Sequence, residues 1–453
     1  MPILRSKNKM EVMPENKLLI QMSLPIIISM LVQALYNIVD SIFVAQIDEN
    51  ALTAVSIAFP IQNLLISVAN GTGVGINALL SRSLGERNSE KADKAAQNGV
   101  FLMLISYIVF MIFGVFFAQA YLESQTDIPA IINYGKAYIT IICCFSITQL
   151  GQITFERLLQ ATGKSIYTMI SQATGAFVNI ILDPILIFGY FGLPKLGVAG
   201  AAAATIIGQY VALTIAVIFN LTKNKELDLS FHHFRPDIHI IGQIYSVGLP
   251  AIIMQSLASV MTYGINKILF TFSSTAAAVF GVYFKLNSFA FMPVFGLTNG
   301  MIPVVSFNYG ARHRKRITKT IKLSILYAMS YMLICLALLQ TFPEKFLYLF
   351  KASENMISIG IPALRIISIS FIFAGFCIVL LAGFQALGHG FMSMIVSFTR
   401  QIIVLLPCAY FFSKSGVLNN VWWAFPCAEI VSVVLSAVFM KIIYNKTIRD
   451  LEP

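Results

Sequence analysis

Twelve apolar runs, each long enough to cross a lipid bilayer as a helix, dominate this chain. A spanning helix needs roughly 20 mostly apolar residues at about 1.5 Å per residue. Helices satisfy their own backbone hydrogen bonds in lipid, so the sequence predicts an all-α integral membrane protein with twelve transmembrane helices and no separate soluble domain. The runs lie near residues 18–45, 53–80, 95–119, 131–159, 165–190, 196–221, 239–271, 275–303, 317–341, 357–384, 391–413 and 419–444.

Composition supports the bilayer as the solvent of this chain. Apolar residues make up 57% of the sequence and charged residues only 11%, whereas soluble domains carry about 25% charged residues. The net charge of +11 would suit nucleic-acid binding if it formed a patch, but the basic residues are spread over alternate connectors. We therefore interpret the charge as a signal of membrane orientation and exclude nucleic acid as a partner.

The basic residues set the orientation of the helices. Connectors on one side of the membrane carry 21 Lys and Arg residues and those on the other side carry 5, and the positive-inside rule places the richer side in the cytoplasm. Both termini are then cytoplasmic. Trp422 and Trp423 begin the last run at the outer side, where we expect both to be interfacial anchors. The richer connectors lie within residues 5–17, 82–94, 164, 223–235, 312–322 and 441–449.

An internal repeat divides the chain into two halves of six helices. When the sequence is shifted by 225 residues, Gly71 falls on Gly296, Ser81 on Ser306 and Arg87 on Arg312. Six is an even number, so both halves enter the membrane from the same side and the repeat is parallel. Such repeats are typical of secondary transporters, whose substrate site lies between the repeats. We expect an N-lobe over residues 1–222, a cytoplasmic connector over 223–238 and a C-lobe over 239–453.

Two acids within the predicted helices of the N-lobe are candidates for ion coupling. A carboxylate in hydrocarbon costs several kcal/mol unless it is paired, hydrated or protonated. Asp40 and Asp183 lie at similar depths near the outer ends of the first and fifth helices, and Asn179 shares the face of Asp183. Burial and a neighbouring carboxylate both favour the protonated form, which a proton-coupled exporter needs. The alternative for Asp40 is a cap at the end of its helix.

Further charged residues lie within the runs. Glu156 is near the cytoplasmic end of the fourth helix beside Arg157, where it could meet a cationic substrate. The alternatives are an interfacial salt bridge or a snorkelling charge. Glu429 could serve a second coupling or substrate site, or it could be a packed, hydrogen-bonded acid. Lys285 and Arg400 are expected to be buried bases of the C-lobe, where they would anchor the lobe interface or discourage metal cations and so favour H⁺ over Na⁺.

The order and spacing of several motifs resemble the multidrug and toxic compound extrusion (MATE) family, and most closely its MepA-like branch within the group that includes the DinF-like transporters. The resemblance covers essentially the whole chain. It implies a V-shaped pair of six-helix bundles that export drugs by antiport with H⁺ or Na⁺. The residues that carry it are Leu24-Pro25, Tyr36 to Asp40, Gly71 to Gly75, Ser83 to Arg87, Asn179 to Pro184 and Glu156.

The resemblance also assigns residues to the site. It implies that Asp40, Asp183 and Asn179, together with Tyr138, form a cation site in the N-lobe. It implies too that Glu156 contacts the substrate as in the MepA-like branch, and we expect Tyr36 and Asn37 beside it. Methionine and aromatic side chains repack around varied shapes, so Met254 and Phe291 are further candidates for substrate contact.

These observations predict a secondary active exporter of lipophilic, mostly cationic drugs in the cell membrane of a prokaryote, acting as a monomer. No ATPase domain is expected, so an ion gradient supplies the energy, with H⁺ preferred over Na⁺ and no cofactor or metal site. The alternative is a lipid-linked oligosaccharide flippase of the related fold, which would need a strongly basic cavity. A membrane-embedded enzyme would need a clustered nucleophile, metal site or acid–base set, and the sequence offers none.

Overall fold

The computed structural model describes residues 8–47, 49–232, 234–350 and 352–452, and within these ranges the chain forms helices and no strand. Ten of these helices are long and apolar enough to cross a membrane, and the number is twelve if each of two bent helix pairs counts as one span. The twelve spans predicted from the apolar runs are therefore present, and the protein is a multi-pass membrane protein.

The first half of the chain forms a bundle that we call the N-lobe. A short helix, α1 (Lys9–Val12), precedes it at the cytoplasmic end. Its spans are α2 (Glu15–Ala45), α3 (Glu49–Gly85), α4 (Ser89–Ile112) continued by the π-helical η1 (Phe113–Phe117) and α5 (Ala118–Glu123), the bent pair α6 (Pro129–Cys144) and α7 (Ile147–Ala161), α8 (Ser165–Phe188) followed by the 3₁₀ turn η2 (Tyr190–Gly192), and α9 (Val198–Lys223).

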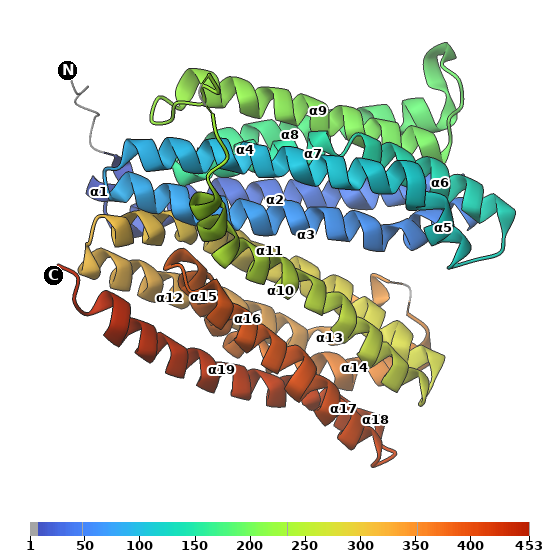
Figure 1. Ribbon diagram of the computed structural model, residues 1–453. Coiled ribbons are helices and arrows are strands. Elements are labelled where there is room, and N and C mark those ends of the chain that lie inside the picture. The colour runs from blue at the N-terminus through green and yellow to red at the C-terminus, as the bar shows by residue number, and fades with distance from the viewer. Residues whose placement is uncertain (1–7, 48, 233, 351, 453) are drawn as a thin grey trace.

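The second half forms the C-lobe in the same order (Figure 1). Its spans are α10 (Ile238–Phe270), α11 (Ser274–Gly310), α12 (Arg314–Thr341) followed by α13 (Pro343–Tyr348), the bent pair α14 (Glu354–Ser368) and α15 (Phe371–Ala386), α16 (Gly390–Phe398) continued by the π-helical η3 (Thr399–Leu405) and α17 (Leu406–Ser413), and α18 (Leu418–Trp422) with α19 (Ala424–Ile443) and the π-helical η4 (Tyr444–Ile448).

The sequence repeat is reproduced in detail by the backbone. The fourth span of the N-lobe bends by 42° between α6 and α7, and the corresponding span of the C-lobe bends by 47° between α14 and α15. The Ser81 hydroxyl donates to the carbonyl of Ala161 at 3.0 Å, and Ser306 donates to the carbonyl of Ala386 at 2.8 Å. Each lobe therefore ties the end of its second span to the end of its fourth by the same hydrogen bond.

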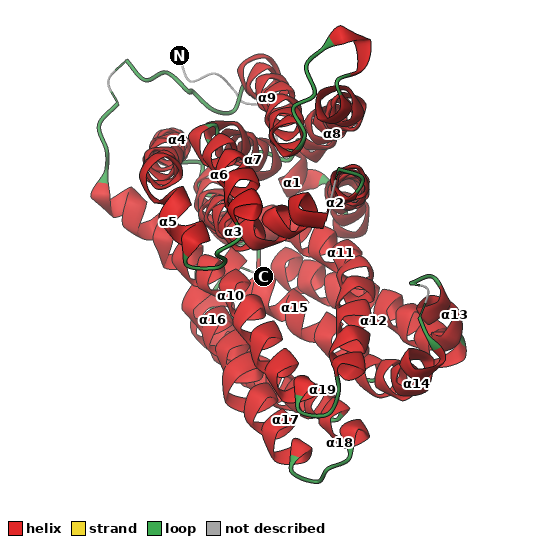
Figure 2. Ribbon diagram, turned by 90° about the vertical axis from the view of Figure 1, so that its right-hand side faces the viewer, coloured by secondary structure: helices red, strands yellow, loops and turns green. Residues whose placement is uncertain are grey.

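The lobes meet through glycines that the repeat places in register. Gly71 on α3 packs against Ile252 of α10, and a Cβ atom there would lie 2.8 Å from the backbone nitrogen of Ile252. Gly296 on α11 packs against Ile27 of α2 in the equivalent way, since a Cβ atom there would lie 3.0 Å from the backbone nitrogen of Ile27. These contacts lie in the cytoplasmic halves of the helices. Toward the outer end the bundles diverge (Figure 1), and a view from that end shows the two bundles side by side (Figure 2). The structure is therefore a V that opens outward.

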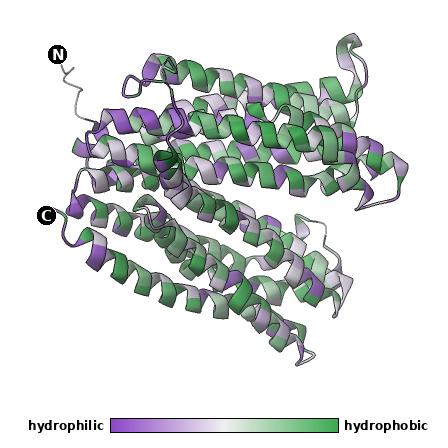
Figure 3. Ribbon diagram, viewed as in Figure 1, coloured by the Kyte–Doolittle hydropathy of each residue, from purple (hydrophilic) through white to green (hydrophobic). Residues whose placement is uncertain are grey.

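Polar and apolar residues are distributed as a bilayer requires. Hydrophilic residues, purple in Figure 3, gather at the end of the molecule where α1 lies. Large apolar side chains along the spans are exposed, for example Val109 at 59% and Phe177 at 64%, because lipid rather than water surrounds them. The expectation that Trp422 is an interfacial anchor is wrong, because it is fully buried in the C-lobe core. Its neighbour Trp423 is 45% exposed, as an anchor would be.

Candidate functional site

Asp40 on α2 and Asp183 on α8 come from adjacent helices and lie close enough to interact electrostatically. Asp183 is fully buried. The Oδ1 atom of Asp40 and the Oδ2 atom of Asp183 are both buried without a hydrogen-bond partner among the described residues. The structure thus brings together the two acids that the sequence placed at a similar depth. It does not make Asp40 a helix cap, because α2 continues to Ala45.

Asn179 lies one helical turn before Asp183 and connects it to α9. Its amide donates to Asp183 Oδ1 and to the hydroxyl of Thr205, each at 3.4 Å. Its own Oδ1 atom is buried without a donor among the described residues. Three acceptor oxygens, one each from Asp40, Asp183 and Asn179, therefore lie in one region without donors. A buried acceptor left without a donor costs about 1–3 kcal/mol, so the region favours a proton, a water molecule or a cation.

Tyr138 on α6 is buried near the two acids and interacts electrostatically with both. Its hydroxyl donates to Gln62 on α3 at 3.4 Å. The tyrosine is therefore in the neighbourhood that the family resemblance implied. Within the described residues no group of three or more His, Cys, Asp or Glu side chains could hold a metal ion.

A polar cavity extends from Asn179 toward the cytoplasm through the middle of the N-lobe. Five glutamines line it, an unusual number of primary amides for a membrane interior. Gly175 on α8 and Gly208 on α9 bring the two helices into backbone contact beside it, since a Cβ atom on Gly175 would lie 2.6 Å from the carbonyl oxygen of Gly208. The lining residues are Gln33, Tyr36, Gln149, Gln152, Ile153, Gln172, Gly175, Ala176, Asn179, Thr205, Gly208, Gln209 and Ala212.

Glu156 on α7 adjoins the cytoplasmic side of this cavity. Its Oε1 atom accepts hydrogen bonds from Gln152 at 3.0 Å and from Ser171 at 3.1 Å, and its side chain is buried. No ion pair joins Glu156 to Arg157 among the described residues, because the Arg157 guanidinium donates to side-chain amides instead. The burial of Glu156 also differs from the snorkelling charge that was the other expectation. Gln152 lines the cavity at the same time, so polar groups run from Asp183 through the cavity to Glu156.

Arg157 joins the lobes, a role that sequence reasoning missed. Its guanidinium donates to Asn299 of α11 at 3.0 Å, to Asn70 of α3 at 3.2 Å and to Gln160 at 2.9 Å. Gly73 makes room for its side chain. The sequence signal was present, since a basic residue near three amides in apolar runs must find acceptors, but nothing in one sequence showed which amides face it.

The C-lobe bases are placed differently from what the sequence suggested. Arg400 on η3 forms an ion pair with Glu429 on α19, with 2.8 Å between NH1 and Oε1, so it is an element of the C-lobe interior and not an anchor of the lobe interface. Glu429 accepts this hydrogen bond through Oε1, while its Oε2 atom is buried without a donor among the described residues. Lys285 is not buried: its side chain is exposed and its ammonium lies 5.9 Å from the ring of Phe350.

The remaining expected contacts separate into lining and core residues. Tyr36 is half-buried and lines the N-lobe cavity, whereas Asn37 is exposed next to it. Met254 is half-buried on α10, with its sulfur 3.8 Å from the amide of Gln385. Phe291 packs in the C-lobe core with its ring centroid 5.2 Å from that of Phe371.

Comparisons with known proteins agree with this architecture. The MatE family model matches residues 25–185 and again 250–411, two matches that begin 225 residues apart. Multidrug export protein MepA of Staphylococcus haemolyticus is 26% identical over 96% of this chain and 95% of its own length. The protein of the same name from Staphylococcus aureus is 24% identical over 96% of both chains.

Solved structures share the fold along almost the whole chain. One is described as the outward-facing conformation of a multidrug resistance MATE family transporter, with TM-score 0.91 and 25% identity over 97% of this chain and 98% of that one. Another is a MOP superfamily transporter from Pyrococcus furiosus, with TM-score 0.90 and 25% identity over 97% and 99% of the chains. Its description says that the reverse polarity of its binding pocket suggests a different function. Because the family model covers most of both lobes, this chain belongs to the MatE family, whose members are membrane transporters rather than enzymes.

Proposed function

We propose that the protein exports lipophilic, mostly cationic small molecules from the cell and that H⁺ entering from outside drives the export. Three lines support the substrate class and direction: the MatE family, the relatives named as multidrug export proteins and the acidic character of the N-lobe site. The lobes alternate between the outward-open V and a conformation open to the cytoplasm. One chain carries a complete pair of lobes, and we propose that it acts as a monomer.

The group of donor-free oxygens at Asp40, Asp183 and Asn179 is the observation that carries this proposal. A proton on either carboxyl group removes its charge and supplies the missing donor. An organic cation in the site instead compensates the ionised carboxylates. The two states are therefore mutually exclusive by charge, and binding of an outside proton displaces the cation. For scale, one H⁺ crossing 100 mV releases about 2.3 kcal/mol, roughly a 50-fold accumulation at 1.36 kcal/mol per tenfold.

The polarity of the pocket argues against the flippase alternative. A pyrophosphate-bearing lipid is anionic and needs a basic cavity, whereas the N-lobe cavity is lined by neutral amides and hydroxyl groups. Its lining residues Asn179 and Gln152 donate hydrogen bonds to the carboxyl groups of Asp183 and Glu156. The basic C-lobe residue Arg400 is already compensated by Glu429. Sodium is the alternative coupling ion, because carboxylate, amide and hydroxyl oxygens are also ligands that hard cations accept.

Dye efflux from proteoliposomes, with either a pH gradient or a Na⁺ gradient imposed, tests the proposal. We expect the pH gradient to drive efflux of a cationic dye and the Na⁺ gradient to have no effect. Asp183→Asn is expected to abolish the pH-driven component. The matched control is Asp127→Asn, which makes the same chemical change on the exposed connector between α5 and α6. Efflux driven by Na⁺ alone, or a glycolipid translocation activity without dye efflux, would overturn it.

A further inference from the structure

The segment from Asn8 to Glu15, here called the cytoplasmic strap, crosses the cytoplasmic end of the V between the two lobes. It contains α1 and the first residue of α2. We propose that the strap is a conformational latch that holds the cytoplasmic side closed, and that releasing it is a required step in opening the site to the cell interior. The latch acts on the equilibrium between the outward-open and the cytoplasm-open arrangements of the two lobes, whichever ion drives transport.

The C-lobe holds the strap mainly through Arg316 on α12. Its guanidinium donates to the carbonyl oxygens of Met10 at 3.1 Å and Met13 at 2.7 Å. The amide of Asn308 on α11 also donates to the carbonyl of Met10, at 3.3 Å. Glu15 completes this end by pairing with Lys319 at 2.9 Å and Arg316 at 3.4 Å. One arginine thus satisfies two carbonyls of a short helix end that α1 cannot satisfy itself.

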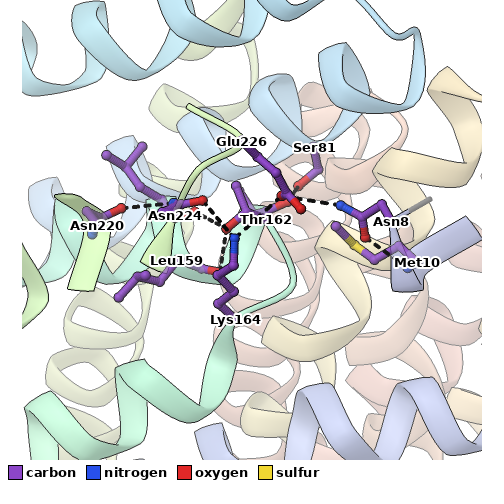
Figure 4. Close-up of polar contacts among 11 residues, drawn as sticks. Asn8, Met10, Ser81, Leu159, Thr162, Lys164, Asn220, Asn224 and Glu226 are labelled. Carbon is purple, nitrogen blue, oxygen red and sulfur yellow. Dashed lines mark hydrogen bonds and ion pairs between the residues drawn. The ribbon is translucent and has the colours of Figure 1, made fainter. Parts of the chain in front are cut away.

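The N-lobe and the connector between the lobes hold the other side of the strap (Figure 4). The amide of Asn8 donates to Glu226 Oε2 at 3.3 Å. Lys164, in the turn between α7 and α8, lies 3.9 Å from the same carboxylate and donates to Asn224 at 3.2 Å. Glu11 forms an ion pair with Arg87 at 3.1 Å. These partners come from three cytoplasmic connections, and none of them is on the C-lobe.

Lys9 packs into this cluster rather than extending into water. Its Cε atom lies 2.9 Å from the position that a Cβ atom on Gly163 would take. Gly163 also has φ +85°, a left-handed backbone conformation that favours glycine. Burial, and then the neighbouring Lys164, lower the pKa of Lys9, while Glu226 opposes the shift. Two lysines therefore depend on one glutamate, which ties the strap to the connector electrostatically as well as sterically.

Met10 adds an apolar plug at the centre of the strap. It is fully buried in a cluster with Leu18 and Met22 of α2 and with Val304 and Phe307 of α11. The cluster lies across the lobe boundary, beside the close contact between Gly85 and Phe307. If α11 moves away from α2 at this end, Met10 loses its partners on one lobe and Arg316 withdraws from the strap carbonyls. Opening the cytoplasmic side therefore breaks the contacts of the strap, whereas the outward-open V preserves them.

Hydrogen–deuterium exchange of the full-length protein in lipid nanodiscs, without drug or gradient, tests the proposal. The variants are Arg316→Ala, which cuts the C-lobe end, and Glu11→Gln, which cuts the pair with Arg87. We expect several-fold faster exchange in peptides at the cytoplasmic lobe contacts, residues 71–81 and 296–306. We also expect slower exchange in the outer halves of α3 and α10 as the V closes there. Lys94→Ala is the control, because it breaks an ion pair of similar length within α4 alone.

The two regions distinguish a latch from local packing. Faster exchange confined to residues 8–22, with the lobe contacts unchanged, would mean that the segment is only packed locally and would overturn the proposal. Thermal unfolding identifies any variant that fails to fold, in which case Glu15→Gln replaces it. The same measurement in an Asp183→Asn background is expected to show the same response, so failure of proton coupling and failure of the latch are separable outcomes.

Discussion

The two lobes share one backbone plan but treat the same positions in opposite ways. Gly175 in the N-lobe corresponds in the repeat to Arg400 in the C-lobe. At Gly175 the helices touch through glycine and leave the glutamine-lined cavity beside them. At Arg400 a side chain fills the space and pairs with Glu429, and the backbone widens into the π-helix η3. Asp183 likewise corresponds to Cys408.

The two lobes therefore share a backbone scaffold but not the side-chain chemistry that it carries. The N-lobe keeps two carboxylates without a basic partner within the described residues, so their charge must be balanced by something that comes and goes. The C-lobe acid Glu429 has a counter-charge of its own in Arg400, although its Oε2 atom is also buried without a hydrogen-bond partner among the described residues. We therefore propose that ion coupling occurs in the N-lobe and that the polar pair of the C-lobe has a structural role.

The largest effect is expected for Asp183→Asn. The amide is nearly the same shape but cannot take up and release a proton, so pH-driven dye efflux is expected to fall by about 100-fold or more. The midpoint temperature of thermal unfolding is expected to stay the same or to rise, because the variant removes a buried carboxyl group that has no counter-charge. Efflux near the wild-type rate, measured alongside Asp127→Asn, would remove the central difference between the lobes.

Breaking the C-lobe pair is expected to reduce stability rather than coupling. Arg400→Gln leaves Glu429 without its counter-charge at a side chain only 10% exposed, a loss of about 1–3 kcal/mol after allowing for the partly exposed arginine. The double variant Arg400→Gln, Glu429→Gln is expected to recover most of that loss in thermal unfolding and to keep its pH-driven efflux. A stable double variant that has lost coupling would show that both lobes bind the ion.

The glycine contact beside the cavity offers a smaller, local test. Gly175→Ala places a methyl group 2.6 Å from the carbonyl oxygen of Gly208, so α8 and α9 are forced apart at a cost of about 1–3 kcal/mol. The fall in the midpoint temperature of thermal unfolding measures this loss of stability. Gly281→Ala is the control, because nothing lies within 4 Å of a Cβ there, and alanine in an open helical position is neutral or stabilising. Equal stability of both variants would contradict the packing described for α8 and α9.

The smallest effect is expected at Gln152. Gln152→Ala removes the donor that reaches Glu156 from the cavity, a hydrogen bond to a charged or protonated acid worth about 1–2 kcal/mol. We expect dye efflux to slow by roughly fivefold, corresponding to about 1 kcal/mol, without loss of fold. Gln243→Ala, at a half-buried position near the start of α10 where the amide bonds to His239, is the matched control. An unchanged efflux rate would separate Glu156 from the transport path.

The spans, their orientation and the repeat could be predicted from the sequence because hydropathy and charge act along the chain. The depth of Asp40 and Asp183 followed from counting residues to the helix ends. Features that depend on which faces meet could not be predicted in this way. The breaks between α6 and α7 and between α14 and α15 do not interrupt the apolar runs, so hydropathy does not show them. Trp422 is of a residue type common at membrane interfaces, although it packs inside the C-lobe. Arg157 and the five glutamines find their partners only in three dimensions.

We propose that the coupling protons are bound by the N-lobe acids and not by the C-lobe acid. Proton release on binding of a cationic drug, followed with a pH indicator in weakly buffered detergent solution, tests it most directly. We expect proton release by the wild type and by the Arg400→Gln, Glu429→Gln variant, and none by Asp183→Asn. Release by Asp183→Asn at the wild-type level, or its loss in the C-lobe double variant alone, would contradict it.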